Sequence, residues 1–462
     1  MAVSEATDRE ELDHIERSAW QTPMTSSILH RFGIWVALFL VLNGAYLYIL
    51  FGSPGQVTSC CDARAYMIGA NHVVESGLLA DTHLIGYRSI WNYALIRGIA
   101  GIGTAIGVPP TDRVPAVIAT ADYAVGAMIA YGAVAALFIG FFSRLAGFGA
   151  AFSAVFLNPI VFAHVPVPLQ ESQMAIIVLP LIVAAYLALK NEKSGTALVL
   201  IAALAAAAWM VKSALITIAL PATLVWAMVL FNSRRLPHAW IASAASVLIA
   251  CLIIAPQVYV AYWKLGTLYP YPNGSVFVDQ LAWGHEYWKW ETVMPPEGNP
   301  KGRAWLSPFG PIAPAEYVGS MLANPLKAVE LFGGHLLTAF DYTNLKVYID
   351  NLALPPMSPN NVIVGMIIFL GLQRTLSLVG PGRYRLHDAV IDASLFGGIV
   401  MLPLLAVETR FSLIPMTMLT VRFLEAVTAR TRDISQSIGM ALIFGLVFAT
   451  AIGFLYDSAK LI

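Results

Sequence analysis

Long apolar runs recur along most of this chain, and they restrict its fold more than any other feature. A helix needs about 20 consecutive apolar residues to cross a bilayer, because each residue advances the helix axis by roughly 1.5 Å. Candidate spans occupy residues 32–51, 115–141, 146–163, 173–189, 195–211, 214–231, 239–262, 361–373, 389–406, 411–427 and 437–455. The sequence therefore predicts an all-α polytopic membrane protein with about eleven transmembrane helices.

The composition agrees with a membrane location. Hydrophobic residues make up 58% of the 462 residues, charged residues make up 12%, and the mean hydropathy is +0.71. Soluble domains usually carry about 25% charged residues. The formal net charge is zero, so the charge gives no indication of a nucleic-acid partner.

Lys and Arg in the short loops predict the orientation, because basic loops stay on the cytoplasmic side. Four short loops are basic, and they carry Lys190 and Lys193, then Arg234 and Arg235, then Arg374, Arg383 and Arg385, and finally Arg430 and Arg432. One alternation of spans puts all four loops on the cytoplasmic side, together with an acidic tail at 1–31. Residues 32–462 then form a single transmembrane domain whose long loops, 52–113 and 263–360, both lie outside. We expect a multi-pass protein of a cell inner membrane.

The two outer loops have patterns of their own. Apolar residues recur at helical spacing over 63–79, 90–106 and 324–340, which predicts juxtamembrane helices lying in the headgroup plane. The second loop also carries several aromatic residues, Trp283, Trp288 and Trp290 among them. Such residues favour membrane interfaces and also stack on sugar rings, and the sequence leaves both interpretations open.

The chain has three cysteines. Cys251 lies in the middle of a predicted span and is interpreted as a packing residue. Cys60 and Cys61 are adjacent on the outer side, either as a vicinal disulfide or as two separate thiols. Their spacing is not that of a metal site.

Ionisable residues in or beside spans are costly to bury, so they usually face a cavity or a partner. In the predicted topology these residues gather at the outer ends of the spans, and they are Asp62, Arg64, Arg88, His164, Glu171, Lys212, Glu408 and Arg410. Their convergence on one membrane level predicts a functional site that faces the periplasm or the exterior.

Each of these residues also has a purely structural interpretation. Lys212 could snorkel to the interface, and Glu408 could pair with Arg410. Asp62 and Glu171 could cap the helices that follow them. His164 could cap a helix as well, and the arginines of the first loop could contact lipid headgroups.

Four sequence motifs follow one another along nearly the whole chain. They are Cys-Asp-Ala-Arg-Ala-Tyr at 61–66, Val-Pro-Val-Pro-Leu-Gln-Glu at 165–171, a Lys followed by an apolar run and Pro at 212–221, and Arg-Phe-Ser-Leu-Ile-Pro at 410–415. In these motifs the chain resembles the GT-C superfamily of polytopic glycosyltransferases, which use polyprenyl-phosphate sugars. It differs in having Phe411 where Tyr is common, and it lacks an Asp-x-Asp pair, so a metal ion is unsupported.

The resemblance implies a helix bundle with outer juxtamembrane helices, a polyprenyl-phosphate-sugar donor, and inversion by single displacement. The acceptor would be a glycan, a lipid or a protein. No cofactor is expected, and the need for a divalent cation stays open. Asp62 would be the general base, a role that contributes roughly 10²–10⁴-fold to rate.

The other roles follow from the same resemblance and from the chemistry of a phosphate leaving group. Fixed cations stabilise the charge that develops on the phosphate, and the candidates are Arg64, Arg88, Lys212 and Arg410. Residues expected to contact the acceptor or to support the site are Glu171, His164, Glu408, Tyr66, Trp283 and Trp288.

Three other classes of protein fit parts of the pattern. A transporter or flippase would share the lipid-linked substrate, but transporters often show repeated halves with broken helices near the midplane, and the charges here lie at one face. A polysaccharide polymerase or ligase would share the donor and the outward site. A noncatalytic scaffold would not need cations gathered near Asp62.

Overall fold

The computed structural model describes most of the chain from residue 61 onward. The described residues are 61–77, 79, 89–106, 121–134, 164–190, 195–212, 216–233, 239–271, 275–293, 301–343, 348–349, 358–379, 386–400, 402–404, 409–428 and 434–458. The predicted tail at 1–31 and the predicted spans 32–51 and 146–163 lie outside them.

Helices dominate the described part of the chain. They are α3 (Cys61–Ser76), α4 (Ile90–Ala105), a helix at Ala121–Val134, α8 (Gln170–Lys190), α9 (Gly195–Val211), α10 (Ile216–Ser233), α11 (Ala239–Leu265), α12 (Ser275–Glu286), α13 (Tyr317–Ala323), α14 (Pro325–Ala339), α15 (Pro359–Leu378), α16 (Leu386–Ile399), α17 (Leu413–Thr428) and α18 (Ile434–Ser458). Short 3-10 turns are η3 (Pro314–Glu316), η4 (Leu402–Leu404) and η5 (Thr409–Ser412).

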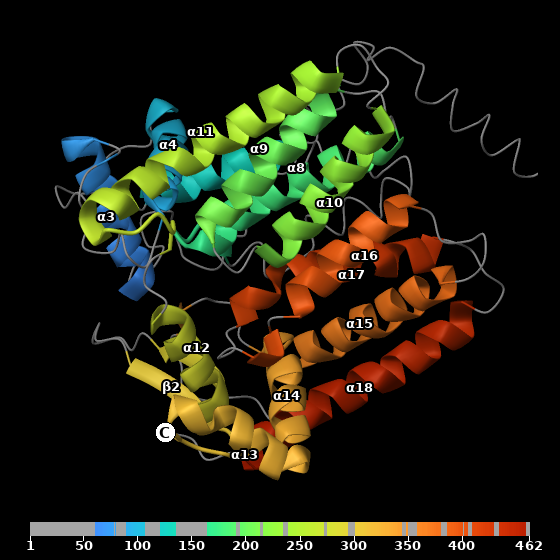
Figure 1. Ribbon diagram of the computed structural model, residues 1–462. Helices are drawn as coiled ribbons and strands as arrows, with labels where there is room; N and C mark the ends of the chain where they lie inside the picture. The colour runs from blue at the N-terminus through green and yellow to red at the C-terminus, as the bar shows by residue number, and fades with distance from the viewer. Residues whose placement is uncertain are drawn as a thin grey trace, which may run out of the picture.

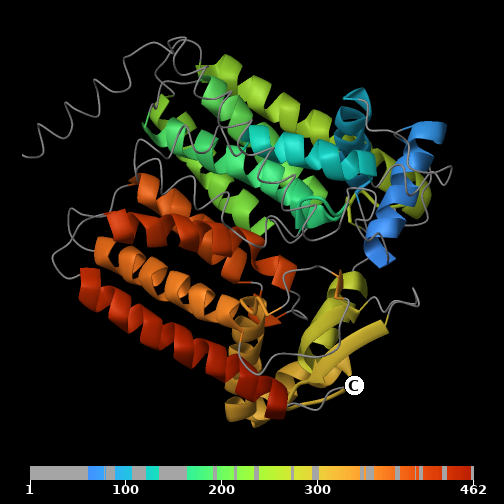
Figure 2. The same ribbon diagram turned by 180° about the vertical axis from the view of Figure 1, so that it is seen from behind.

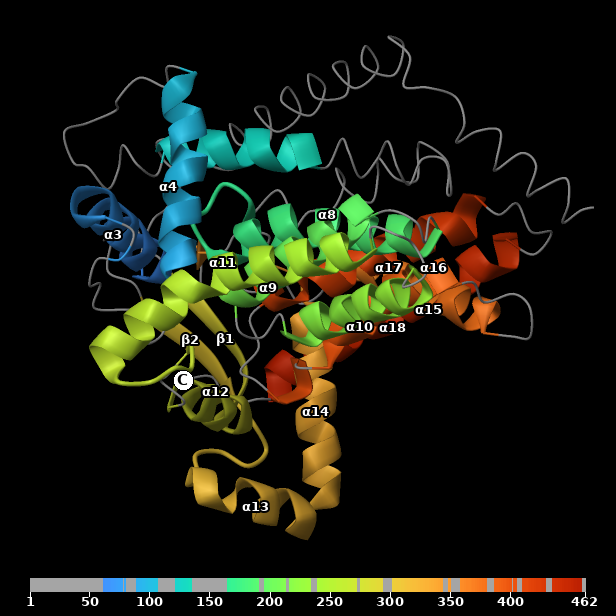
Figure 3. The same ribbon diagram turned by 45° about the horizontal axis from the view of Figure 1, so that its top comes forward.

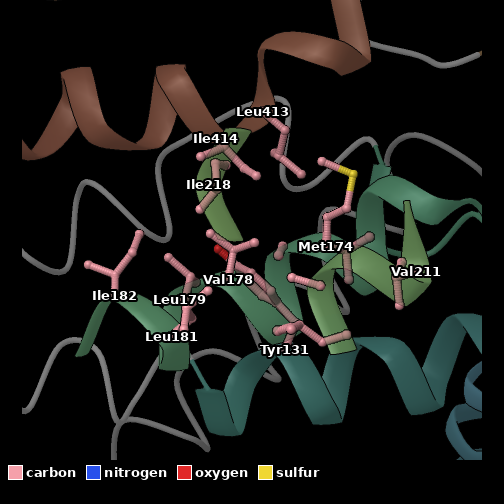
Figure 4. Packing of buried hydrophobic residues seen from close by; sticks show 14 of the residues in the cluster. Tyr131, Met174, Val178, Leu179, Leu181, Ile182, Val211, Ile218, Leu413 and Ile414 are labelled. Carbon is pink, nitrogen blue, oxygen red and sulfur yellow. The ribbon is translucent and has the colours of Figure 1, made fainter. Parts of the chain in front are cut away.

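The long helices lie in two adjoining layers, one formed by α8–α11 and the other by α15–α18 (Figure 1). Helix α16 joins the layers, because it packs against both α8 and α10. Figure 4 shows part of the core between them, where Met174 and Val178 of α8 lie near Val211 of α9 and near Leu413 and Ile414 of α17.

Three of the described helices are long and apolar enough to cross a membrane, at Ala239–Leu265, Pro359–Leu378 and Ser437–Asp457. On α11, Trp240, Leu248 and Leu252 are 71%, 61% and 57% exposed. An apolar surface of this extent favours contact with lipid over contact with water. Together with the composition, these helices indicate a membrane protein.

Helix α15 is longer than the predicted span 361–373. It covers 20 residues because its polar ends find partners. Near its start, the Asn361 amide donates to Asp341 Oδ1 at 2.8 Å, and near its end Arg374 Nε lies 3.5 Å from Glu425 Oε2. A hydropathy pattern stops at such polar residues, although the helix continues through them.

Helices α3, α4, α12 and α14 gather at one end of the two layers (Figures 1 and 2). Figure 3 shows that α4 and α14 run across the direction of the long helices. The helices predicted over 63–79, 90–106 and 324–340 are therefore confirmed as α3, α4 and α14. Gly77, which follows α3, has φ +94, a backbone conformation that glycine adopts readily.

Small residues allow α4 to approach its neighbours closely. A Cβ atom on Gly126 would lie 1.8 Å from the Ile99 carbonyl oxygen, and one on Gly103 would lie 2.1 Å from the carbonyl oxygen of Asp122. Thr104 Oγ1 donates to the Asp122 carboxylate across the same contact at 3.0 Å. Gly103 and Gly126 therefore serve helix packing.

The second long loop also forms a small sheet, which the all-α prediction did not include. Its strands are β1 (Tyr287–Val293), β2 (Lys301–Leu306) and β3 (Tyr348–Ile349), in the order β2-β1-β3. Strand β1 pairs antiparallel with β2 and parallel with β3. Aromatic and β-branched residues favour strands, and in β1 that preference produces a strand beside the helical bundle.

Candidate functional site

Side chains from three other segments hold the C-terminal end of α9. The last carbonyls of a helix lack partners within the helix. Asn92 Nδ2 and Gln170 Nε2 both donate to the Val211 carbonyl oxygen, each at 2.9 Å. The Tyr271 hydroxyl lies 2.6 Å and 2.8 Å from the next two carbonyl oxygens toward the N-terminus, those of Trp209 and Met210. The backbone that leads into Lys212 is therefore fixed in place.

The Lys212 side chain reaches the turn η5. Its Nζ atom lies 4.2 Å from the centre of the Phe411 ring. A cation over an aromatic ring is attracted by about 0.5–2 kcal/mol, depending on its exposure. The contact joins two of the predicted motifs, because Arg410 belongs to the same turn. The Arg410 side chain and all of Glu408 lie outside the described residues.

Turn η5 is anchored by a residue that follows α14. The Tyr342 hydroxyl lies 3.2 Å from Ser412 Oγ, and both residues are buried. The Tyr342 backbone N–H donates to Asn361 Oδ1 at 2.6 Å. The end of α14 and the start of α15 therefore position the turn that carries Phe411.

The proline-containing loop before α8 is a packed turn. His164 and Gln170 are 5% and 6% exposed. The Val167 N–H donates to the His164 carbonyl at 3.1 Å, and the Leu169 N–H donates to the Val167 carbonyl at 2.7 Å. This compact path brings Gln170 to the end of α9. Glu171 follows in α8, and its side chain lies outside the described residues.

The start of α4 is tied to α11. The Ser89 side chain caps the helix by accepting the Trp91 N–H at 3.1 Å. Gln257 of α11 accepts the Ile90 N–H at 2.9 Å and donates to the Pro270 carbonyl at 2.8 Å. Arg88 precedes Ser89 in sequence and lies outside the described residues.

Helix α3 carries three of the predicted site residues. Asp62 is half-buried in its first turn, where the helix dipole favours a carboxylate. Arg64 is exposed, whereas Tyr66 is 2% exposed and packs in the core. A Cβ on Gly69 would lie 2.4 Å from the Tyr93 ring, so α3 lies directly against α4. Asp62 is linked in this way to the helix whose Asn92 holds α9.

The loop aromatics separate into an exposed pair and a buried residue. The Trp283 and Trp290 rings stack, with centroids 6.3 Å apart and planes at 11°, and they are 51% and 37% exposed. Trp288 is 5% exposed and packs against Gly334 of α14. The ladder is irregular between Tyr287 and Lys289, and such a bulge lets two consecutive residues, Trp288 and Lys289, both face inward.

A buried ionic cluster beside β1 was not predicted from the sequence. Lys289 Nζ lies 2.9 Å from Glu291 Oε1 and forms a short ion pair with Asp341, and Arg303 Nε donates to Glu291 Oε2 at 3.0 Å. Tyr456 of α18 also accepts from Lys289, at 2.9 Å. The cluster connects the sheet to α14 and α18.

Attraction within this cluster outweighs burial. Burial by itself lowers the pKa of Lys289, but Asp341 and Glu291 reverse the shift, so the pKa of Lys289 is raised. Burial likewise raises the pKa of Asp341, yet Lys289 holds that pKa well below its usual range. Both groups are therefore charged at neutral pH. Their sequence signal was the two-residue spacing of Lys289 and Glu291, which puts both on one face of a strand.

A second buried cluster joins α16 and α17. Arg422 is 0% exposed, and its guanidinium donates to Asp388 and Asp392 at 2.9 Å and to Glu425 at 2.8 Å. A buried arginine with several carboxylate partners holds neighbouring helices in one register.

One expectation about a single cysteine is wrong. Cys251 was predicted to pack inside a span, but it is exposed on α11, because α11 buries little of its surface. Within the described part of the chain, no group of three or more His, Cys, Asp or Glu residues is arranged to hold a metal ion.

No family model, curated protein or solved structure matches this chain.

Proposed function

We propose that this protein is a membrane glycosyltransferase that moves a sugar from a polyprenyl-phosphate donor to an acceptor on the outer side of a cell inner membrane. The observation that carries the proposal is the fixed position of Lys212. Asn92 and Gln170 hold the backbone next to it, and Phe411 orients its ammonium group. A cation held in this way suits a phosphate group at the membrane surface.

The reaction that fits is a single displacement with inversion. An acceptor hydroxyl oxygen forms a bond to the anomeric carbon while the bond from that carbon to the phosphate oxygen breaks. The hydroxyl proton goes to a carboxylate, and Asp62 of α3 is our candidate. The lipid phosphate leaves with the bonding electrons, so it needs no proton.

Fixed cations accelerate such a reaction by stabilising the charge that grows on the leaving phosphate. Removing one fixed donor of this kind typically costs about 10²–10³-fold in rate. Lys212 takes this role, with Arg410 of turn η5 and with Arg64 and Arg88 from the first long loop. Preorganisation by Tyr271 and Asn92 means that little energy is spent on orienting Lys212 during the reaction.

The membrane arrangement belongs to the same proposal. Eleven spans with both long loops outside put the ends of α4, α9 and α14 at one membrane surface. A lipid-linked donor presents its phosphate at that level, because its polyprenyl chain stays in the bilayer. The exposed pair Trp283 and Trp290 suits the acceptor, since paired aromatic faces stack on sugar rings.

The test is donor turnover by the purified full-length protein in proteoliposomes. Radiolabelled polyprenyl-phosphate sugars of several kinds are compared for wild type, Asp62→Asn and Lys212→Met, with Lys264→Met as a control at an exposed lysine of α11. We expect turnover of one donor by wild type and by the control, and losses of 100-fold or more in the two site variants.

Three other outcomes would each contradict part of the proposal. Unchanged turnover in Asp62→Asn would remove Asp62 as the base. Movement of intact donor across the vesicle without cleavage would identify a flippase. The absence of turnover with every donor would overturn the transferase assignment.

A further inference from the structure

Three side-chain atoms on α4 and α8 are buried and have no hydrogen-bond partner among the described residues. They are Asn92 Oδ1, Gln173 Oε1 and Gln173 Nε2. Asn92 is 0% exposed and Gln173 is 1% exposed. Both side chains keep their full hydrogen-bonding capacity at these atoms, although water cannot reach them in this state.

These atoms belong to one neighbourhood. The other end of the Asn92 amide, Nδ2, donates to the Val211 carbonyl, and so does Gln170. Gln173 follows Gln170 by three residues in α8. Residues three apart on a helix are neighbours on its surface, with Cβ atoms about 5–6 Å apart. The Gln173 side chain therefore starts about one turn of α8 away from Gln170, which binds the Val211 carbonyl next to Lys212.

Buried polar side-chain atoms nearly always have a partner, so several unpartnered atoms in one place indicate a missing one. Two of these atoms are acceptors, and a phosphate offers them no donor at neutral pH. An alkyl chain satisfies none of the three. A hydroxyl group both donates and accepts, so a group with several hydroxyls satisfies all three atoms at once.

We infer that Asn92 and Gln173 form a recognition subsite for the hydroxyl groups of the donor sugar, beside the phosphate position at Lys212. The inference rests on the proposed function, because it needs a sugar phosphate at Lys212. It adds two residues that no sequence motif indicated. Hydroxyls on the sugar ring donate to Asn92 Oδ1 and Gln173 Oε1 and accept from Gln173 Nε2.

The test separates recognition of the sugar from recognition of the lipid phosphate. The thermal unfolding temperature of the full-length protein in detergent is measured alone, with polyprenyl phosphate, and with the same lipid carrying mannose, glucose or arabinose. Wild type is compared with Gln173→Met, which keeps the size of the side chain and removes its hydrogen bonds. Gln173→Asn keeps the amide on a shorter side chain.

We expect bare polyprenyl phosphate to stabilise wild type and both variants equally. One sugar-bearing lipid should stabilise wild type further, and its affinity should be about tenfold weaker in Gln173→Met, as loss of two hydrogen bonds implies. Gln173→Met should unfold at the same temperature as wild type or higher without ligand, because it buries no unsatisfied amide. The matched change Gln170→Met removes a bond that is already formed, so it should lower that temperature.

The failures are distinguishable. A sugar increment that is equal in wild type and Gln173→Met would overturn the subsite while leaving the transferase proposal intact, as would a wild type that gains nothing from any of the sugars. Without ligand, Gln173→Met could also unfold at a temperature as low as that of Gln170→Met. That result would overturn the subsite, because it would identify a bound water or a structural hydrogen bond at Gln173. No stabilisation by bare polyprenyl phosphate would contradict the phosphate site itself, and the subsite would fall with it. If Gln173→Met does not fold, the same comparison is made with Gln173→Asn.

Discussion

The ammonium group of Lys212 and the ring of Phe411 are in contact, with 4.2 Å from Nζ to the ring centre. The two residues come from segments far apart in the sequence, at the end of α9 and in η5. Each segment is held separately, α9 by Asn92 and Gln170 and η5 by Tyr342. The contact is therefore set by the backbone positions of the two segments, and it does not depend on the lysine side chain finding one conformation among many.

Removing the ring should weaken catalysis modestly. Phe411→Leu keeps an apolar side chain but loses an attraction of about 0.5–1 kcal/mol, which corresponds to roughly a two- to fivefold lower kcat/KM for the donor. Phe411→Tyr keeps the ring and should behave like wild type. Steady-state kinetics of both variants test this, and equal activities for the leucine and tyrosine variants would show that the ring does not orient Lys212.

The buried pair of Lys289 and Asp341 should behave as a coupled unit. Either Lys289→Met or Asp341→Asn leaves an uncompensated buried charge, so each should destabilise the protein by about 3–5 kcal/mol. The double variant should be less destabilised than the sum of the two. A double-mutant cycle from denaturant unfolding in detergent measures the coupling, and strict additivity would mean that the pair contributes no interaction of its own.

Protonation of the buried His335 should be visible in the pH dependence of protein stability. Its two ring nitrogens lie 2.7 Å and 3.0 Å from the carbonyl oxygens of Pro403 and Tyr287. Burial lowers the pKa of His335, so the neutral ring predominates and donates to one of these carbonyls at a time. The folded chain then binds fewer protons than the unfolded chain, whose histidine pKa is about 6.5.

Stability should therefore be constant above about pH 7 and should fall as the pH drops through 6.5 toward 5. Asp341 does not obscure this window, because its lowered pKa means that its contribution is lost only below about pH 4. The unfolding temperature of His335→Gln should depend less on pH than that of wild type. A parallel decline in both proteins would assign the effect to other groups, among which His285 also has a lowered pKa.

Two glycines close to each other in the structure should respond to alanine in opposite directions. Gly126→Ala puts a Cβ 1.8 Å from the Ile99 carbonyl oxygen, so two helices must separate, at a cost of about 2 kcal/mol. Gly98 of α4 has no atom within 4 Å of an added Cβ, so Gly98→Ala should stabilise by about 0.5–1 kcal/mol through helix propensity. Thermal unfolding of the two variants decides, and destabilisation by Gly98→Ala would contradict the open surface at that position.

The aromatic residues of the second long loop should have different roles. Trp283→Ala removes one ring of an exposed pair, so it should raise the KM for the acceptor severalfold while leaving protein stability within about 0.5 kcal/mol of wild type. Trp288→Ala empties a buried position against Gly334 and should destabilise by about 3–5 kcal/mol. Acceptor kinetics and unfolding curves of both variants give the answer, and an unchanged acceptor KM in Trp283→Ala would assign the pair to the membrane interface.

Hydropathy predicted the positions of several described helices, because an apolar run long enough to cross a bilayer is also read as a helix. Helix α9 at Gly195–Val211 matches its predicted span of 195–211, and the juxtamembrane helices α3, α4 and α14 also lie where the periodicity indicated. The sheet was missed because Trp288 and Trp290 were interpreted only as aromatic residues that favour an interface or a sugar ring. An aromatic residue at an interface and one in a strand have the same hydropathy, and pairing with β2 decides between them.

The candidate site was partly predictable. Lys212 and the 410–415 motif, which the sequence grouped together, are in contact through the Phe411 ring. Asn92 and Gln173 were not predictable, since an amide inside an apolar pattern resembles any other polar interruption. The two ionic clusters were missed for a related reason. Their partners lie in different helices and strands, and only the packing of those elements shows that the charges are matched.

The two hydrogen bonds that the Val211 carbonyl accepts restrict the relative motion of the helices around it. One oxygen receives amide protons from α4 and from α8, so the three helices cannot slide past one another at this point without losing hydrogen bonds in an environment that offers no replacement. Alternating access by a rocking half would have to break this joint in every cycle. The backbone amides around Ala208 to Lys212 should instead exchange with deuterium as slowly as those in the most protected part of the protein. Slow exchange is the behaviour expected of a rigid junction that does not open during function.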